Sequence, residues 1–107
     1  MAEPGFVKVA QVDDLSPGKL MMVEVGDYEI LLANVAGTIY ACDNVCTHAF
    51  APLSEGVLDG ERVECPLHGS IFNVTNGEAI GPPADENLMV YQVRMAGQDI
   101  LVGPPTG

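Results

Sequence analysis

Two short stretches, Cys46-Thr47-His48 and Cys65-Pro66-Leu67-His68, constrain this chain more than any other feature of its 107 residues. Each presents a thiol and an imidazole together, and 16 residues separate the two stretches. They contain both histidines and two of the three cysteines of the chain. Thiolates and imidazoles are ligands of zinc and of iron–sulfur clusters. We therefore expect the chain to fold around one metal centre held by Cys46, His48, Cys65 and His68.

Two kinds of centre use two cysteines and two histidines. Zinc binds them in a closed tetrahedron, whereas a [2Fe-2S] cluster can hold one iron by two cysteines and the other by two histidines. A zinc knuckle usually opens with two ligands further apart, because a tight turn must aim both at one ion. Only Thr47 separates Cys46 from His48, which suits ligands of adjacent metals better. Spacing favours the cluster and leaves a zinc-stabilised interaction domain as an alternative.

The residues around these stretches resemble the Rieske family of [2Fe-2S] proteins. The family pattern Cys-x-His followed by Cys-x-x-His is met by Cys46-Thr47-His48 and Cys65-Pro66-Leu67-His68. Gly69-Ser70-Ile71-Phe72-Asn73 is similar to the segment that follows the family's second histidine. Gly81-Pro82-Pro83 is similar to the proline loop that closes over the cluster. One departure is Ala49, where ferredoxin members usually have Gly.

The resemblance implies a cofactor, its ligands and a fold. Cys46 and Cys65 would bind the buried iron of one [2Fe-2S] cluster, and His48 and His68 would bind the outer iron near the surface. The implied fold is all-β, a small antiparallel β-sandwich or barrel with a cluster-binding subdomain.

The family also indicates where the reduction potential should lie. High-potential members carry an extra cysteine in each ligand loop, joined as a disulfide, and a Ser and a Tyr that donate hydrogen bonds to cluster sulfurs. The corresponding cysteine positions here are Ala51 and Leu67, and the hydroxyl positions are Ser70 and Phe72. Rieske centres span roughly −150 to +300 mV. We expect a potential near the low end of that range.

Charge limits the partners that such a chain could bind. Its 15 acidic and 4 basic residues give a formal net charge of −11, although 48% hydrophobic residues make it globular. Phosphates and anionic lipids would repel it, whereas a basic protein surface would attract it. Residues 1–5 have no features of a signal peptide, and no apolar run is long enough to span a bilayer. We expect a cytoplasmic protein that binds neither nucleic acid nor membrane.

Alternating apolar residues and turn signals predict strands but no amphipathic helix. The segment 57–64 has the pattern of a hairpin, with Asp59-Gly60 in a type I′ turn. Residues 81–87 and 104–107 are expected to form a proline-stiffened loop and a loose end. The remaining expected strands lie at residues 6–12, 20–25, 28–35, 38–41, 71–74, 88–94 and 100–102.

A chain of this length allows one small domain, which we place at residues 1–107, with the cluster-binding part at about 42–83. Cys42 is left over, and we expect it to be a small buried side chain rather than a ligand. Tyr40 and Phe72 are expected in the core. An odd number of cysteines also suits a reducing compartment.

No second metal site, nucleotide loop or paired nucleophile and base accompanies the motif, so the chain is expected to be an electron carrier and not an enzyme. By resemblance, it is similar to the ferredoxin component of bacterial aromatic-ring dioxygenase systems. Its partners would be a flavin-dependent ferredoxin reductase and a terminal Rieske non-haem iron oxygenase, and it would itself be a monomer. The edge formed by His48, His68 and the loop at residues 81–83 would be the contact surface. The alternative is a small Rieske subunit of another complex, such as a monooxygenase or a nitrite reductase.

Overall fold

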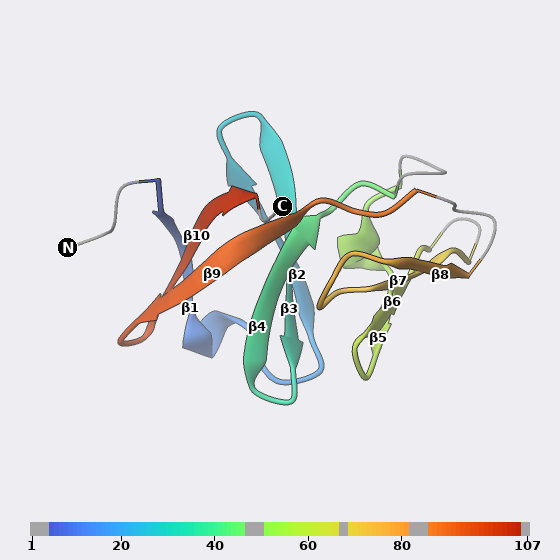
Figure 1. The fold of residues 1–107 in the computed structure, drawn as a ribbon. Coiled ribbons are helices and arrows are strands. Elements are labelled where there is room, and N and C mark those ends of the chain that lie inside the picture. The colour runs from blue at the N-terminus through green and yellow to red at the C-terminus, as the bar shows by residue number, and fades with distance from the viewer. Residues whose placement is uncertain (1–4, 47–50, 67–68, 82–85, 106–107) are drawn as a thin grey trace.

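A computed structural model shows two antiparallel β-sheets that lie side by side (Figure 1). It describes residues 5–46, 51–66, 69–81 and 86–105, so the predicted ligands His48 and His68 and the prolines 82–83 lie outside the described residues. The strands are β1 (Val7–Gln11), β2 (Leu20–Val25), β3 (Tyr28–Val35), β4 (Thr38–Asp43), β5 (Val57–Asp59), β6 (Arg62–Glu64), β7 (Ile71–Asn73), β8 (Ala79–Gly81), β9 (Val90–Ala96) and β10 (Asp99–Pro105).

Helix is limited, over the described part of the chain, to two 3₁₀ turns, η1 (Val12–Asp14) and η2 (Leu53–Glu55). The predicted all-β fold is therefore confirmed. No helix within the described ranges is long and apolar enough to cross a membrane.

The larger sheet has six strands in the order β1-β10-β9-β4-β3-β2. Its two edge strands, β1 and β2, contact each other, so the sheet curls into a nearly closed barrel. Alternate residues of β3 point to opposite faces. Ile30 and Leu32 belong to the core inside this barrel, whereas Leu31 and Ala33 belong to a second core on the outer face. Burial on both faces explains why β3 is the longest apolar run in the sequence.

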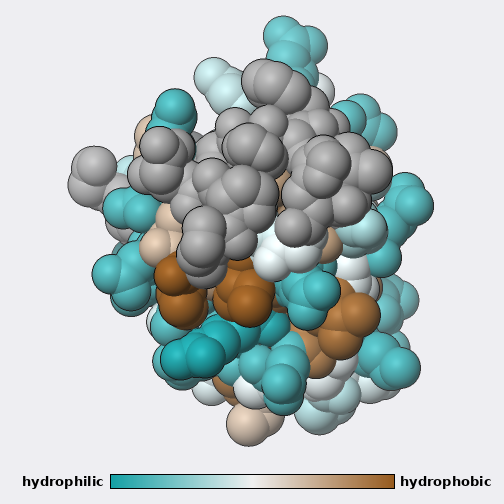
Figure 2. All heavy atoms as spheres, turned by 90° about the vertical axis from the view of Figure 1, so that its right-hand side faces the viewer, coloured by the Kyte–Doolittle hydropathy of each residue, from teal (hydrophilic) through white to brown (hydrophobic). Residues whose placement is uncertain are grey.

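The smaller sheet has four strands in the order β5-β6-β7-β8, each three residues long. Val63 and Phe72 from this sheet pack with Leu31 and Cys42 of the larger sheet in the second core. Figure 2 shows the end of the molecule formed by the smaller sheet, where hydrophobic side chains reach the surface among hydrophilic ones. The two sheets therefore share a core although each has its own strand pairing.

The predicted hairpin at residues 57–64 forms, but its predicted turn is wrong. Asp59 is the last residue of β5 and pairs with Arg62, so Gly60 and Glu61 form the turn. A type I′ turn needs positive φ at both central residues, and only Gly60, at 63°, has one. The buried Val63 sets the register from inside the core.

Other strand boundaries also differ from the sequence predictions, and three of these strands lie after residue 78. The first residue of the expected loop at residues 81–87, Gly81, belongs to an unpredicted strand, β8. The expected strand 88–94 instead starts at Val90 and continues to Ala96. The expected loose end begins within β10, which runs to Pro105, where Pro105 pairs with Tyr91 after a break in the register. Proline is tolerated next to such a bulge because the regular ladder is already interrupted.

Candidate metal centre

The first ligand loop, residues 46–51, leaves the larger sheet shortly after β4. Cys46 is fully buried. Its backbone N–H donates a hydrogen bond to the carbonyl of Ala51 at 2.9 Å, and next to it Val45 and Pro52 form an isolated β-bridge. The base of the loop is thus closed, so the position of the Cys46 backbone is set by protein contacts.

The second ligand loop, residues 65–70, leaves the smaller sheet directly after β6 and closes in the same way. The Cys65 N–H donates to the carbonyl of Ser70 at 2.7 Å, again to the residue five positions ahead. Gly69 N–H donates back to the Cys65 carbonyl at 3.3 Å, with Gly69 at a φ of 75°. Glycine adopts this left-handed conformation without strain.

The structure brings the two predicted cysteine ligands into one buried cluster. Cys46 and Cys65 lie there with Leu53, Phe72 and Leu88, and neither cysteine forms a disulfide. The predicted burial of Phe72 is confirmed, whereas Tyr40 is only partly buried.

The structure describes two of the four predicted ligands, Cys46 and Cys65. Among the described residues, no group of three or more His, Cys, Asp or Glu side chains is arranged to hold a metal ion. The two predicted histidine ligands lie outside that set. Assignment of all four ligands therefore stays a prediction.

One buried hydroxyl indicates that a further group belongs in this region. Ser70 is fully buried, and its Oγ is, among the described side chains, a buried polar atom without a hydrogen-bond partner. Leaving such a group unpaired costs roughly 1–3 kcal/mol. The sulfur atoms of a cluster would accept a hydrogen bond from it, and the buried Cys65, whose N–H donates to the Ser70 carbonyl, lies five residues earlier. The residues present therefore fit an iron–sulfur cluster.

Asn44 braces the first loop and was missed by the sequence analysis. This buried side chain accepts a hydrogen bond from the Ser54 N–H at 2.9 Å and donates to Glu29 Oε1 at 3.3 Å. Its backbone carbonyl accepts from the Leu53 N–H at 2.7 Å. Asn44 therefore ties the entry of the loop to its exit. The available signal was an Asn placed directly between an apolar strand and a predicted ligand.

Asp43 forms a second brace, between β4 and the residues around the start of β9, Met89 and Tyr91. Its Oδ1 accepts from the Tyr91 hydroxyl at 2.7 Å, its Oδ2 accepts from the Met89 N–H at 3.2 Å, and its own N–H donates to the Met89 carbonyl at 2.9 Å. Burial, and then the hydrogen bond to Asp43, raise the pKa of Tyr91 above its ordinary range. Tyr91 therefore stays protonated and acts as a hydrogen-bond donor.

The third cysteine is buried, as predicted. Burial, followed by the negative charge of Asp43, raises the pKa of the Cys42 thiol to about 12. A thiol with this pKa is uncharged at neutral pH and is a poor nucleophile.

The comparisons with known protein families and known sequences agree with each other. Residues 5–98 match the Rieske [2Fe-2S] domain. The chain is 37% identical to the ferredoxin component of the naphthalene 1,2-dioxygenase/salicylate 5-hydroxylase systems of Ralstonia sp, over 91% of this chain and 93% of that protein.

Two solved structures are similar along nearly the whole chain. The ferredoxin of carbazole 1,9a-dioxygenase from Nocardioides aromaticivorans IC177 matches with a TM-score of 0.88 and 36% identity, covering 92% of this chain and 97% of that one. A chain in a complex of reduced oxygenase and oxidised ferredoxin in carbazole 1,9a-dioxygenase matches with a TM-score of 0.88 and 35% identity, covering 94% of each chain.

Proposed function

Because this chain belongs to the Rieske [2Fe-2S] domain family, we propose that it carries single electrons from a flavin-dependent ferredoxin reductase to the terminal oxygenase of an aromatic-ring dioxygenase system. The observation that carries the proposal is the match, along nearly the whole chain, to ferredoxin components of such systems. One related ferredoxin is found in complex with its oxygenase. The chain is an electron carrier and does not itself act on the aromatic compound.

The proposed ligands are Cys46 and Cys65 for the inner iron and His48 and His68 for the outer one. Support comes from the two buried thiols in one cluster and from the matching backbone closure of their loops. A bound cluster of this type gains and loses one electron at a time.

The protein residues around the site exclude water and supply hydrogen bonds. Cys46 and Cys65 are at most 1% exposed, so solvent does not reach their sulfur atoms. Ser70 holds one hydroxyl ready for donation inside the core. Ala51 and Phe72 provide neither a thiol nor a hydroxyl at the positions where high-potential members have them. These features support a potential toward the low end of the Rieske range.

The proposal also covers domain organisation, location, oligomeric state and nucleic-acid binding. The chain is one domain over residues 1–107, with its cluster-binding part at about residues 42–83, and the core shared by the two sheets supports this. We propose a cytoplasmic monomer that binds no nucleic acid, which agrees with a net charge of −11.

Low-temperature EPR of the dithionite-reduced protein tests the cofactor. Mixed histidine and cysteine ligation lowers the average g value relative to a cluster held by four cysteines. A zinc-stabilised domain would give neither visible absorption nor a reducible signal. Detection of zinc without iron and sulfide in the purified protein would contradict the proposal.

Electron transfer to purified partners tests the function. Mixing the reduced protein with oxidised terminal oxygenase in a stopped-flow instrument should give a second-order rate that falls severalfold as ionic strength rises. The Debye length shortens from about 30 Å at 0.01 M to about 8 Å at physiological ionic strength, so steering by the acidic surface weakens. A subunit of another oxidoreductase would instead copurify in a fixed ratio with its large partner.

A further inference from the structure

A cavity of about 390 Å³ opens on the flank of the barrel beside Asp43, the last residue of β4. It lies between the β2–β3 turn, the segment at residues 89–91 and the end of β10. Its walls are largely apolar, and they include Val25, Ile30, Val102 and Pro104. None of these residues is a predicted ligand, so the cavity is separate from the metal centre.

Exposed apolar side chains gather around this cavity. Tyr28 and Met89 line it and are 64% and 44% exposed. Val45, 37% exposed, lines a neighbouring hollow that also contains Tyr28. Single exposed hydrophobic residues are common, but three around adjoining hollows are characteristic of a binding surface. We call Tyr28, Val45 and Met89 the Tyr28 patch.

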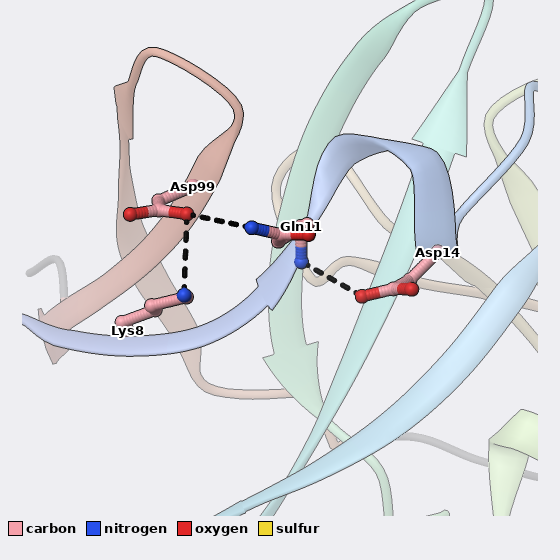
Figure 3. A network of polar contacts seen from close by, with 4 residues as sticks. All are labelled: Lys8, Gln11, Asp14 and Asp99. Atoms are coloured by element: carbon pink, nitrogen blue, oxygen red, sulfur yellow. Dashed lines mark hydrogen bonds and ion pairs between the residues drawn. The ribbon is translucent and has the colours of Figure 1, made fainter.

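The Tyr28 patch has an acidic rim. Asp27, Glu29 and Asp43 line the two hollows, and none of the described lining residues is Lys, Arg or His. At the other end of the barrel, Lys8 lies 3.3 Å from Asp99, and Gln11 and Asp14 extend this network (Figure 3). The surface around Tyr28 therefore complements an apolar side chain flanked by basic ones.

The wall of the cavity is fixed before any partner arrives. Asp43 holds Tyr91 and Met89 through the three hydrogen bonds described above, which join the cavity wall to the strand that leads to Cys46. Binding to a preorganised surface loses less conformational entropy than binding to a mobile one. Val45 directly precedes Cys46, so a partner bound here contacts the residue that leads into the first ligand loop.

We propose that the Tyr28 patch is a docking site for the protein that accepts the electron, namely the terminal oxygenase, in addition to the contact edge of His48, His68 and residues 81–83 that the sequence predicts. The oxygenase inserts an apolar side chain into the cavity and pairs Lys or Arg side chains with Asp27 and Glu29. This inference rests on the proposed function. Each electron makes the carrier more negative by one charge, so a basic surface binds the reduced carrier more tightly. An electron acceptor must bind the reduced carrier more tightly than the oxidised one. An electron donor must bind the oxidised carrier more tightly.

Binding and electron-transfer measurements on the cluster-loaded protein test this site. Tyr28→Ala and Asp27→Lys should each raise the dissociation constant for the oxygenase, measured by calorimetry, by about tenfold. The second-order rate of oxygenase reduction should fall by a similar factor. The rate of reduction by the flavoprotein reductase should stay within about twofold, and the visible spectrum and midpoint potential should not change.

Two variants far from the patch serve as matched controls. Met95→Ala removes another exposed apolar side chain, at the β9–β10 end of the barrel, and Asp13→Lys makes the same charge change in η1. Both should bind the oxygenase like the wild type. Equal effects of control and patch variants, or a loss confined to the reductase reaction, would overturn the docking site. A wild-type protein that cannot reduce the oxygenase would overturn the proposed function as well.

Discussion

The two ligand loops close with the same backbone hydrogen bond, yet they stand on different supports. The first follows β4, which pairs with β3; these strands have six and eight residues and belong to the larger sheet. The second joins β6 to β7, strands of three residues each. Longer strands make more ladder hydrogen bonds and bury more side chains, so the first support is stable over a longer stretch of chain.

The buried polar groups beside the two loops differ in whether they have hydrogen-bond partners. On the first side, the buried Asn44 has protein partners for both its amide nitrogen and its amide oxygen. On the second side, the buried Ser70 hydroxyl has none among the described residues. The polypeptide thus satisfies the buried polar group of the first side, whereas a bound cluster would accept the hydrogen bond that Ser70 offers on the second. We expect loss of the cofactor to affect the two sheets unequally.

Replacing a cysteine of the second loop should have the largest effect. Cys65→Ala should abolish iron and sulfide binding, because a thiolate ligand is lost. Hydrogen exchange should then show β6 and β7 losing most of their amide protection while β3 and β4 keep theirs, since metal binding and folding share free energy in small domains. The control Cys42→Ala should retain iron and sulfide. Equal loss of protection in both sheets would remove the distinction between the two supports.

Removing the brace of the first loop should have the next largest effect. Asn44→Ala leaves the Ser54 N–H without its acceptor, at a cost of roughly 1–3 kcal/mol in the free energy of unfolding, measured in urea. Asn73→Ala is the matched change in the smaller sheet. The Asn73 side chain is less buried and bonds mainly to the neighbouring Thr75, so this variant should lose less. A larger loss of unfolding free energy in Asn73→Ala than in Asn44→Ala would mean that Asn44 is not the main brace.

Alkaline pH should act through Cys42 on the larger sheet. Its pKa is raised from 9.0 to about 12, so between these pH values the unfolded chain has lost the thiol proton and the folded chain has kept it. Ionisation of Cys42 in the unfolded chain therefore lowers the free energy of unfolding by about 1.4 kcal/mol for each pH unit above 9. The difference in unfolding free energy between wild type and Cys42→Ala should shrink between pH 9 and pH 10.5. A constant difference would show that Cys42 ionises freely in the folded state.

The smallest expected effect belongs to the buried Ser70 hydroxyl of the second loop. Ser70→Ala should lower the midpoint potential by about 40 mV, since one hydrogen bond contributes about 1 kcal/mol and 59 mV corresponds to a tenfold change for one electron. The unfolding free energy should change little. Ser54→Ala, beside the first loop, is the control and should leave the potential unchanged.

Local patterns in the sequence predicted much of the larger sheet. The segments 20–25 and 28–35 match β2 and β3 residue for residue. The prediction was accurate because each apolar run ends at residues that favour turns. The hairpin at 57–64 was recognised but its turn was not, because the register depends on Val63 packing against residues of another sheet. β8 was missed since a three-residue strand carries almost no periodic signal and forms only by pairing with β7.

By itself, the sequence determined the class of the site: two cysteines and two histidines at family spacing name both the ligands and the cofactor to expect, since ligand chemistry depends on residue type. Only the tertiary structure decided that Cys46 and Cys65 share one buried core, that the Ser70 hydroxyl has no partner among the described residues and that Asn44 is a brace. It also decided that Tyr28, Val45 and Met89 meet around adjoining hollows. These relations join residues far apart along the chain, and sheet pairing, which local patterns do not encode, brings them together.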